Sequence, residues 1–183
     1  MLQYATRAEL RKFGTEMLQE QRVNLRKAAE SAAPLNATFL SHSSKDDELV
    51  DGAIRILKNH GALVYIDKID PTMPPYTNAE TARKLKDRVK QAKKFVLLAS
   101  DNSKESKWVP WELGIADGFK SLANIALFPA VEDAGKTGWT SWEYLGLYRR
   151  IVWGNIKGYE KSGWMVLDEP RNTADWLKDW LKA

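Results

Sequence analysis

The clearest β-strand signal in the sequence is the run Phe95-Val96-Leu97-Leu98-Ala99, in which every side chain is apolar. A strand with one face in water alternates apolar and polar residues, whereas a strand covered on both faces is apolar throughout. The run therefore predicts a central strand of a parallel sheet, with helices on both faces.

Weaker strand signals flank this run and alternate with segments of helical periodicity. Strands are expected at residues 37–40, 62–66, 125–128 and 149–153, and helices at 48–59, 78–93, 110–120 and 173–181. Gly61 is expected to cap the helix before it, and Thr173 to cap the last helix. Strands and helices that alternate with short connections form parallel sheets. We expect an α/β fold with a five-stranded parallel sheet, for which the flavodoxin-like order 2-1-3-4-5 is one known arrangement.

The segment before the first strand predicts one amphipathic helix over residues 6–33, ended by Pro34. Its apolar side chains recur at mostly helical intervals and are Leu10, Phe13, Met17, Leu25, Ala28 and Ala32. Packing on the domain is favoured over contact with a second copy, because such stripes are usually buried within one chain. The sequence thus divides into a helical extension, residues 1–34, and a domain with a C-terminal helix, residues 35–183.

Composition narrows the chemistry that this chain is expected to perform. Its 183 residues include no cysteine and only two histidines, so we predict no disulfide and no metal site. The formal charge of +4 is modest and interspersed, and the basic run at residues 83–90 is expected to be a solvated helix face rather than a nucleic-acid site. With neither a secretory signal nor a membrane-spanning run, we expect a cytoplasmic protein that does not bind membranes.

One carboxylate stands out in the stretch Lys107-Trp108-Val109-Pro110-Trp111-Glu112-Leu113-Gly114. Proline is favoured in a first helical turn and disfavours the helical conformation in the residue before it, so a helix is expected to begin near Pro110. Glu112 would then lie in that first turn. An acid there simply complements the helix dipole in many proteins, and this is the alternative to a catalytic role.

The expected topology places Glu112 near a second polar segment. In a sheet of order 2-1-3-4-5, ligands bind beyond the carboxyl ends of strands 1 and 3, where the winding reverses. These ends carry Ser41-His42-Ser43-Ser44 and the loop that leads to Trp108 and Glu112. The sequence therefore predicts a pocket that contains Glu112.

Three motifs in order resemble those of TIR (Toll/interleukin-1 receptor) domains. Residues 39–46, Phe39-Leu40-Ser41-His42-Ser43-Ser44-Lys45-Asp46, resemble the first family box. Tyr65-Ile66-Asp67 and the proline-containing loop after it resemble the second box and the BB loop, although the usual turn is replaced by Pro71-Thr72. Residues 108–112 fit the WxxxE pattern of TIR domains that cleave NAD. The resemblance covers residues 35–153.

This resemblance implies a role for each matching position. It makes Glu112 the catalytic residue and Trp108 part of the wall around it, and it places Tyr76 against the nicotinamide end. The remaining substrate-binding positions that it implies are Ser41, His42, Ser43, Asp67 and, from a subunit interface, Trp139. For Ser41 and Ser43 the competing interpretation is that they only cap the next helix, and for His42 that it is an exposed loop residue.

The implied activity needs few groups. Loss of nicotinamide builds positive charge on the ribose while the ring departs neutral, so one ionised carboxylate suffices and no cofactor is expected besides the substrate NAD⁺. The product is either ADP-ribose or a cyclic isomer. The resemblance implies prokaryotic antiviral defence, homo-oligomers formed through TIR contacts or the N-terminal helix, and a sensor or effector protein as partner. The alternative is a non-catalytic TIR scaffold.

Overall fold

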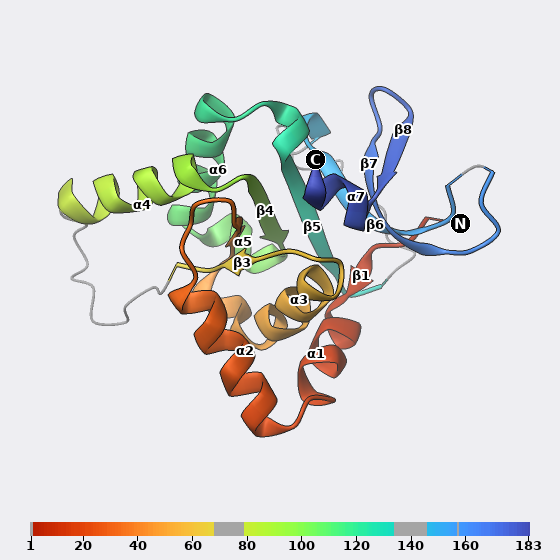
Figure 1. The fold of residues 1–183 in the computed structure, drawn as a ribbon, viewed down its shortest axis with the longest axis horizontal. Coiled ribbons are helices and arrows are strands. Elements are labelled where there is room, and N and C mark those ends of the chain that lie inside the picture. Colours follow the sequence, from red (N-terminus) through yellow and green to blue (C-terminus); the bar gives the residue numbers. More distant parts are fainter. Residues whose placement is uncertain (1, 68–78, 134–145, 157) are drawn as a thin grey trace.

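A computed structural model describes residues 2–67, 79–133, 146–156 and 158–183 (Figure 1). The strands are β1 (Ala5–Thr6), β2 (Thr38–Ser41), β3 (Val64–Tyr65), β4 (Lys94–Ala99), β5 (Ile125–Val131), β6 (Arg149–Gly154), β7 (Gly163–Asp168) and β8 (Thr173–Trp176). The helices are α1 (Arg7–Thr15), α2 (Gln19–Ser31), α3 (Asp47–Asn59), α4 (Ala79–Gln91), α5 (Asp101–Glu105), α6 (Trp108–Phe119) and α7 (Leu177–Lys182). Two short 3₁₀ turns are η1 (Ser44–Asp46) and η2 (Leu122–Asn124). None of the helices in these ranges has the length and apolar character that a bilayer crossing needs.

The expected parallel sheet is present. Strands β3, β2, β4, β5 and β6 lie side by side in that order and all pair in parallel, which is the order 2-1-3-4-5. Strand β4 lies at the centre, and all its residues are buried. Phe95 on this strand is the register partner of Phe39 on β2, and their rings stack with centroids 5.6 Å apart. The prediction from residues 95–99 is confirmed.

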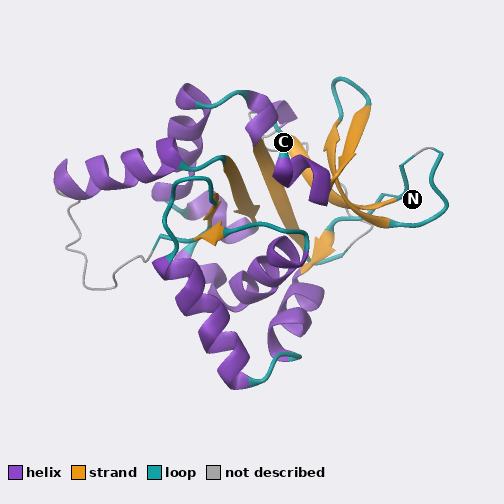
Figure 2. Cartoon of the chain, in the orientation of Figure 1, coloured by secondary structure: helices purple, strands orange, loops and turns teal. Residues whose placement is uncertain are grey.

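Helices cover both faces of the sheet, as expected for such an apolar central strand. Val96 and Leu98 face one core cluster, which also contains buried side chains of α1, α2, α3 and α7. Phe95 and Leu97 face a second cluster, which includes Leu85 and Val89 of α4 and buried residues of α6. Figure 2 shows the two helical layers on either side of the orange strands. Gly61 has a φ of +93° just after α3, so its predicted capping role is confirmed.

The prediction of a single N-terminal helix is wrong. Helix α1 ends at Thr15, helix α2 begins at Gln19, and β1 precedes both and pairs with β5. A straight helix over residues 6–33, with a rise of about 1.5 Å per residue, would be longer than α3 and would extend past its end. Two shorter helices can both pack against α3. Arg55 of α3 donates to the Phe13 carbonyl at 2.7 Å near the end of α1.

The break changes which side chains face inward. Leu10 and Ala29 are fully or almost fully buried, and Phe13 and Leu25 pack against the same core. Ala28, which was expected to face inward, is exposed instead. A residue in α2 is not in helical register with one in α1, because the connecting residues leave the helical conformation. Packing of this segment on the domain, rather than away from it, is thus observed.

The C-terminal region differs most from the expectation. Residues 173–176 form β8, which pairs antiparallel with β7, and β7 pairs antiparallel with β6 (Figure 1). The predicted helix is therefore shortened to α7, and Thr173 is a strand residue rather than its cap. Trp176 is favourable in a strand and lies over Gly163 of β7, where a Cβ atom would come within 2.9 Å of the indole. Leu177, Trp180 and Leu181 are buried, as expected.

Candidate active site

Glu112 lies in the second turn of α6, not in the first. The helix begins at Trp108, two residues earlier than Pro110 predicted, and its first turn contains no acidic residue. Proline is tolerated there because early helical N–H groups have no partner within the helix. Since the dipole interaction falls off within the first turn, it does not explain a carboxylate at position 112.

The carboxyl group of Glu112 is buried and bonded to the end of strand β2. Its residue is 6% exposed, and the hydroxyl of Ser41 donates a hydrogen bond to its Oε2 atom. Burial raises the pKa of Glu112 to about 8, the Ser41 hydrogen bond opposes this, and the negative charge of Asp67 raises the pKa further. The two segments that the topology predicted to meet, after β2 and after β4, therefore do meet.

Trp108 shares a helix face with Glu112, because the two residues are four positions apart. Its indole is partly buried, packs against the core cluster beneath α6 and meets Trp111 edge to face with centroids 5.4 Å apart. The preceding polar segment is not a plain loop as expected, since it contains α5. Trp108 is thus held in a fixed orientation on the face of α6 that carries the buried acid.

Asp67 follows β3 and is held by two partners. Its Oδ1 atom accepts a hydrogen bond from the Tyr65 hydroxyl at 2.9 Å and from the guanidinium of Arg88 on α4. Arg88 belongs to the basic run that was expected to be only a solvated helix face. Leu85 and Val89 of that run are buried, as expected, but Arg88 reaches across to the edge of the site.

The two remaining residues after β2 differ in their surroundings. Ser43 is buried, and its hydroxyl accepts a hydrogen bond from the Lys45 N–H at 3.3 Å, so it caps η1. His42 is partly buried rather than exposed, and burial lowers the pKa of its imidazole, which is therefore neutral at neutral pH. Of the three, only Ser41 bonds directly to Glu112.

A cavity of about 240 Å³ opens beside this cluster. It lies between α2 and the ends of β2 and β3, and its lining residues are Arg26, Glu30, His42, Ser44, Asp47, Ile66 and Asp67. His42 adjoins Ser41 in the chain, and Asp67 acts electrostatically on Glu112. The cavity is therefore a neighbour of the buried acid, although Glu112 does not line it.

Two of the predicted positions, Tyr76 and Trp139, lie outside the described residues. Their roles stay predictions of the family resemblance. Within the described ranges, no group of three or more histidines, cysteines or acids is arranged to hold a metal ion.

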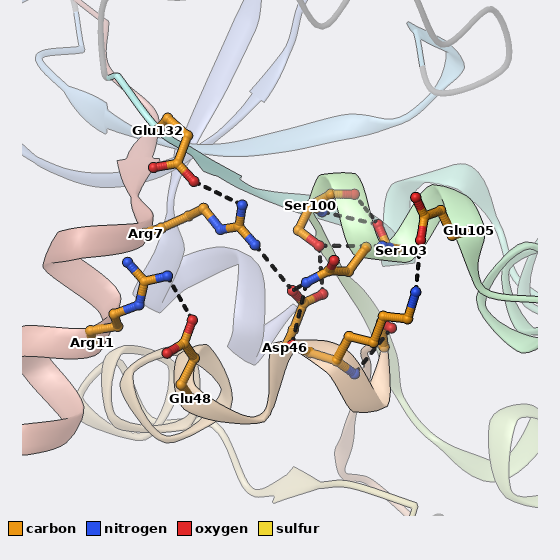
Figure 3. Close-up of polar contacts among 11 residues, drawn as sticks. Arg7, Arg11, Asp46, Glu48, Ser100, Ser103, Glu105 and Glu132 are labelled. Carbon is orange, nitrogen blue, oxygen red and sulfur yellow. Dashed lines mark hydrogen bonds and ion pairs between the residues drawn. The ribbon is translucent and has the colours of Figure 1, made fainter.

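Asp46 is a buried polar centre that the prediction of site residues missed. The carboxylate of this fully buried residue accepts hydrogen bonds from Ser100 at 2.5 Å and from Asn102 at 2.6 Å, both after β4. Arg7 of α1 lies 3.8 Å from it and also binds Glu132 at 2.8 Å (Figure 3). Asp46 thus ties together the loops after β2 and β4. The only signal in the sequence was its place as the acid of the first family box.

Comparison with known proteins identifies the family of the chain. A family model described as "TIR domain" matches residues 38–163, and the chain belongs to this family. A similar relative is the "Probable 3' cyclic ADP-D-ribose synthase ThsB'" of Bacillus cereus (strain MSX-D12), which is 34% identical over 120 residues. That alignment covers 64% of this chain and 61% of the relative, so the chain matches less than two thirds of the relative's length.

Proposed function

We propose that this protein cleaves the bond between nicotinamide and ribose in NAD⁺, with Glu112 as the catalytic residue. The observation that carries the proposal is a buried carboxylate bonded to Ser41, on the helix face that also carries Trp108. The similarity to a cyclic ADP-ribose synthase supports the same substrate. The products are nicotinamide and either ADP-ribose or a cyclic isomer.

The proposed step is dissociative. The C–N bond between the ribose C1′ and the nicotinamide nitrogen breaks, and its electron pair leaves with the nicotinamide, which becomes neutral. The positive charge passes to the ribose, where ionised Glu112 stabilises it in a water-poor site. Water, or a ribose hydroxyl or adenine nitrogen of the adenosine half, then attacks C1′ and loses its proton to solvent, which gives the linear or a cyclic product.

The raised pKa of Glu112 fits this chemistry. In the free protein a neutral carboxyl avoids the cost of an unpaired buried charge. A bound pyridinium ring supplies a positive charge beside the carboxyl and favours its ionised form. Trp108 offers an indole face to the same cation. The substrate would therefore ionise the group that acts on it.

The same proposal includes a role in antiviral defence with activation by self-association, which rests on membership of the TIR family. The competing function is a TIR scaffold without catalysis. A scaffold could use the N-terminal helices for assembly, but α1 and α2 pack against the core of their own chain.

The test incubates purified protein at high concentration with NAD⁺ and follows nicotinamide by chromatography. We expect release by the wild-type protein and loss of release in Glu112→Gln, which keeps the size of the side chain. Glu48→Gln is the control, because Glu48 is exposed in the first turn of α3 and bonded to Arg11 of α1. Release that persists in Glu112→Gln would exclude Glu112 as the catalytic residue, and no release from any assembled form would favour the scaffold.

A further inference from the structure

The cavity beside the acid has a lining rich in hydrogen-bond acceptors. Among its described lining residues are three carboxylates, from Glu30 of α2, Asp47 of α3 and Asp67 after β3, and one cation, Arg26. His42 adds a neutral imidazole, because burial lowers its pKa, and Ser44 adds a hydroxyl. The cavity is therefore acidic overall, and it is built in part by the N-terminal helix α2.

Arg26, the cation among the described lining residues, already has a carboxylate partner. Arg26 binds both carboxylate oxygens of Asp47, at 2.5 Å and 3.0 Å, in a fork-like pair. Burial lowers the pKa of Arg26, but the hydrogen bond to Asp47 and the charges of Asp51, Asp47 and Glu30 outweigh burial, so the pKa is raised. A phosphate entering the cavity would have to displace Asp47 and to lie beside Glu30. The lining therefore disfavours an anionic group.

The chemistry of the lining fits a sugar. Vicinal hydroxyls donate to carboxylates, and an acid that binds the ribose 2′-hydroxyl is the usual device of proteins that select NAD over NADP. Among the described lining residues, the one ring is the small imidazole of His42, so these residues offer no large aromatic platform for a base. At about 240 Å³ it is smaller than the roughly 300–1,000 Å³ of sites that enclose a drug-sized ligand. A single ribose is a suitable occupant, whereas a whole dinucleotide is not.

The position of the cavity indicates which ribose of the substrate it takes. The reacting ribose must lie against Glu112, and Glu112 is absent from the seven described lining residues. The cavity begins one residue along the chain from Ser41, the partner of that acid. Of the two sugars in a dinucleotide, the one left for this cavity is the ribose of the adenosine half.

Building on the proposed function, we infer that the cavity between α2 and the ends of β2 and β3 binds the adenosine ribose of NAD⁺ and excludes NADP⁺. Glu30 and Asp47 are the specificity-determining residues. Each accepts a hydrogen bond from the ribose hydroxyls, and each repels the 2′-phosphate that NADP⁺ carries at this position. The N-terminal helices would thereby contribute directly to substrate choice.

The experiment compares NAD⁺ and NADP⁺ in two measurements on the full chain. Nicotinamide release gives kcat/KM for each, and calorimetry on Glu112→Gln gives Kd for each without turnover. We expect kcat/KM to be at least about tenfold lower, and Kd at least about tenfold higher, for NADP⁺ than for NAD⁺. Glu30→Gln and Asp47→Asn should each narrow this ratio about fivefold or more, and Asp47→Asn should act mainly by freeing Arg26 for the phosphate.

Glu20→Gln is the matched control, because it removes the same charge from an exposed position of the same helix. A ratio that changes equally in the control would show a long-range charge effect and overturn the inference. Equal use of the two dinucleotides by the wild type, with no response to Glu30→Gln or Asp47→Asn, would also overturn it. If no nicotinamide is released but the Kd ratio responds to these two variants as expected, the proposed reaction fails and the inference about the cavity holds.

Discussion

Glu112 keeps its proton to a higher pH than an ordinary glutamate, because its carboxyl is removed from water and lies near Asp67. A buried acid with such a pKa is a frequent mark of functional sites. Ser41 opposes the shift, since the hydrogen bond that its hydroxyl donates favours the ionised form of Glu112. This balance between burial and one hydrogen bond sets the pH at which the proposed reaction can run.

The rate of nicotinamide release should therefore rise with pH. We expect kcat/KM, which reports on the free enzyme, to increase up to a plateau above about pH 8. The midpoint for kcat should lie lower, because the bound cationic ring favours ionised Glu112. Rates measured from pH 5.5 to 9.5 at constant ionic strength check this. Rates that do not vary across this range would contradict the assignment of the ionised group.

Glu112 should also lower the free energy of unfolding as the pH rises. Between pH 4.5, which is the ordinary pKa of a glutamate, and about pH 8, which is the pKa of Glu112 in the folded protein, the folded protein keeps the proton on Glu112 and the unfolded chain has lost it. Stability from this group is thus fully present below 4.5 and falls by on the order of 1 kcal/mol per pH unit through that window. Urea unfolding should show Glu112→Gln more stable than the wild type at pH 8 and similar to it at pH 4.5. A difference independent of pH would contradict this.

Replacing Ser41 isolates the role of its hydrogen bond. Ser41→Ala removes the donor that favours ionised Glu112, so the pKa should rise and the kcat/KM profile should move to higher pH by about half a unit or more. Ser31→Ala is the control, because the Ser31 hydroxyl bonds only within α2, to the Lys27 carbonyl. A lower rate with an unmoved profile would mean that Ser41 acts only by contacting the substrate.

Helices α1 and α3 touch backbone to backbone, and this contact fixes the N-terminal segment to the domain. A Cβ atom at Gly52 of α3 would lie 2.1 Å from the Leu10 carbonyl oxygen of α1, which is far inside the contact limit. Leu10 itself is fully buried. Glycine is thus required at position 52 for the close approach and not for an unusual backbone conformation.

Gly52→Ala should consequently destabilise the fold. Forcing the two helices apart in a packed core typically costs about 1–3 kcal/mol. Gly118→Ala on α6 is the matched control, since nothing lies within 4 Å of its added methyl group. It should be neutral or stabilising by up to about 1 kcal/mol. The melting temperatures of Gly52→Ala and Gly118→Ala, measured by thermal unfolding, check this prediction. Equal melting temperatures would show that α1 can move away from α3 at little cost.

At the scale of the whole molecule, the N-terminal segment contributes a strand to the sheet and polar side chains to the surroundings of the site. Strand β1 pairs with β5, Arg7 supplies the cation beside buried Asp46, and α2 lines the cavity. The division of the chain at residue 34 stays a prediction of the sequence. The contacts across that boundary indicate that the two parts depend on each other.

A chain that begins at residue 35 should therefore fail to fold cooperatively. The truncation removes α1 and α2, which exposes the core that Leu10 and Ala29 cover. It also removes Arg7, the cation beside Asp46. Heat-capacity scans and near-UV circular dichroism measure this. Leu18→Ser is the control, because Leu18 is 71% exposed in the link between the two helices. A truncated chain with a sharp unfolding transition would show that the domain is independent of the extension.

The strands and helices of the parallel sheet in residues 35–153 followed from the sequence, because each has its own periodicity. The resemblance to TIR domains implied their order and the role of Glu112, and that role stays a prediction. Local patterns could not show that residues 6–33 break into two helices around α3, or that residues 173–176 pair with β7. The contacts of Ser41 with Glu112, of Asp67 with Arg88 and of Arg7 with Asp46 join residues 21 or more positions apart. Only the tertiary structure decided these features, because packing and charge compensation between distant segments outweigh local preference.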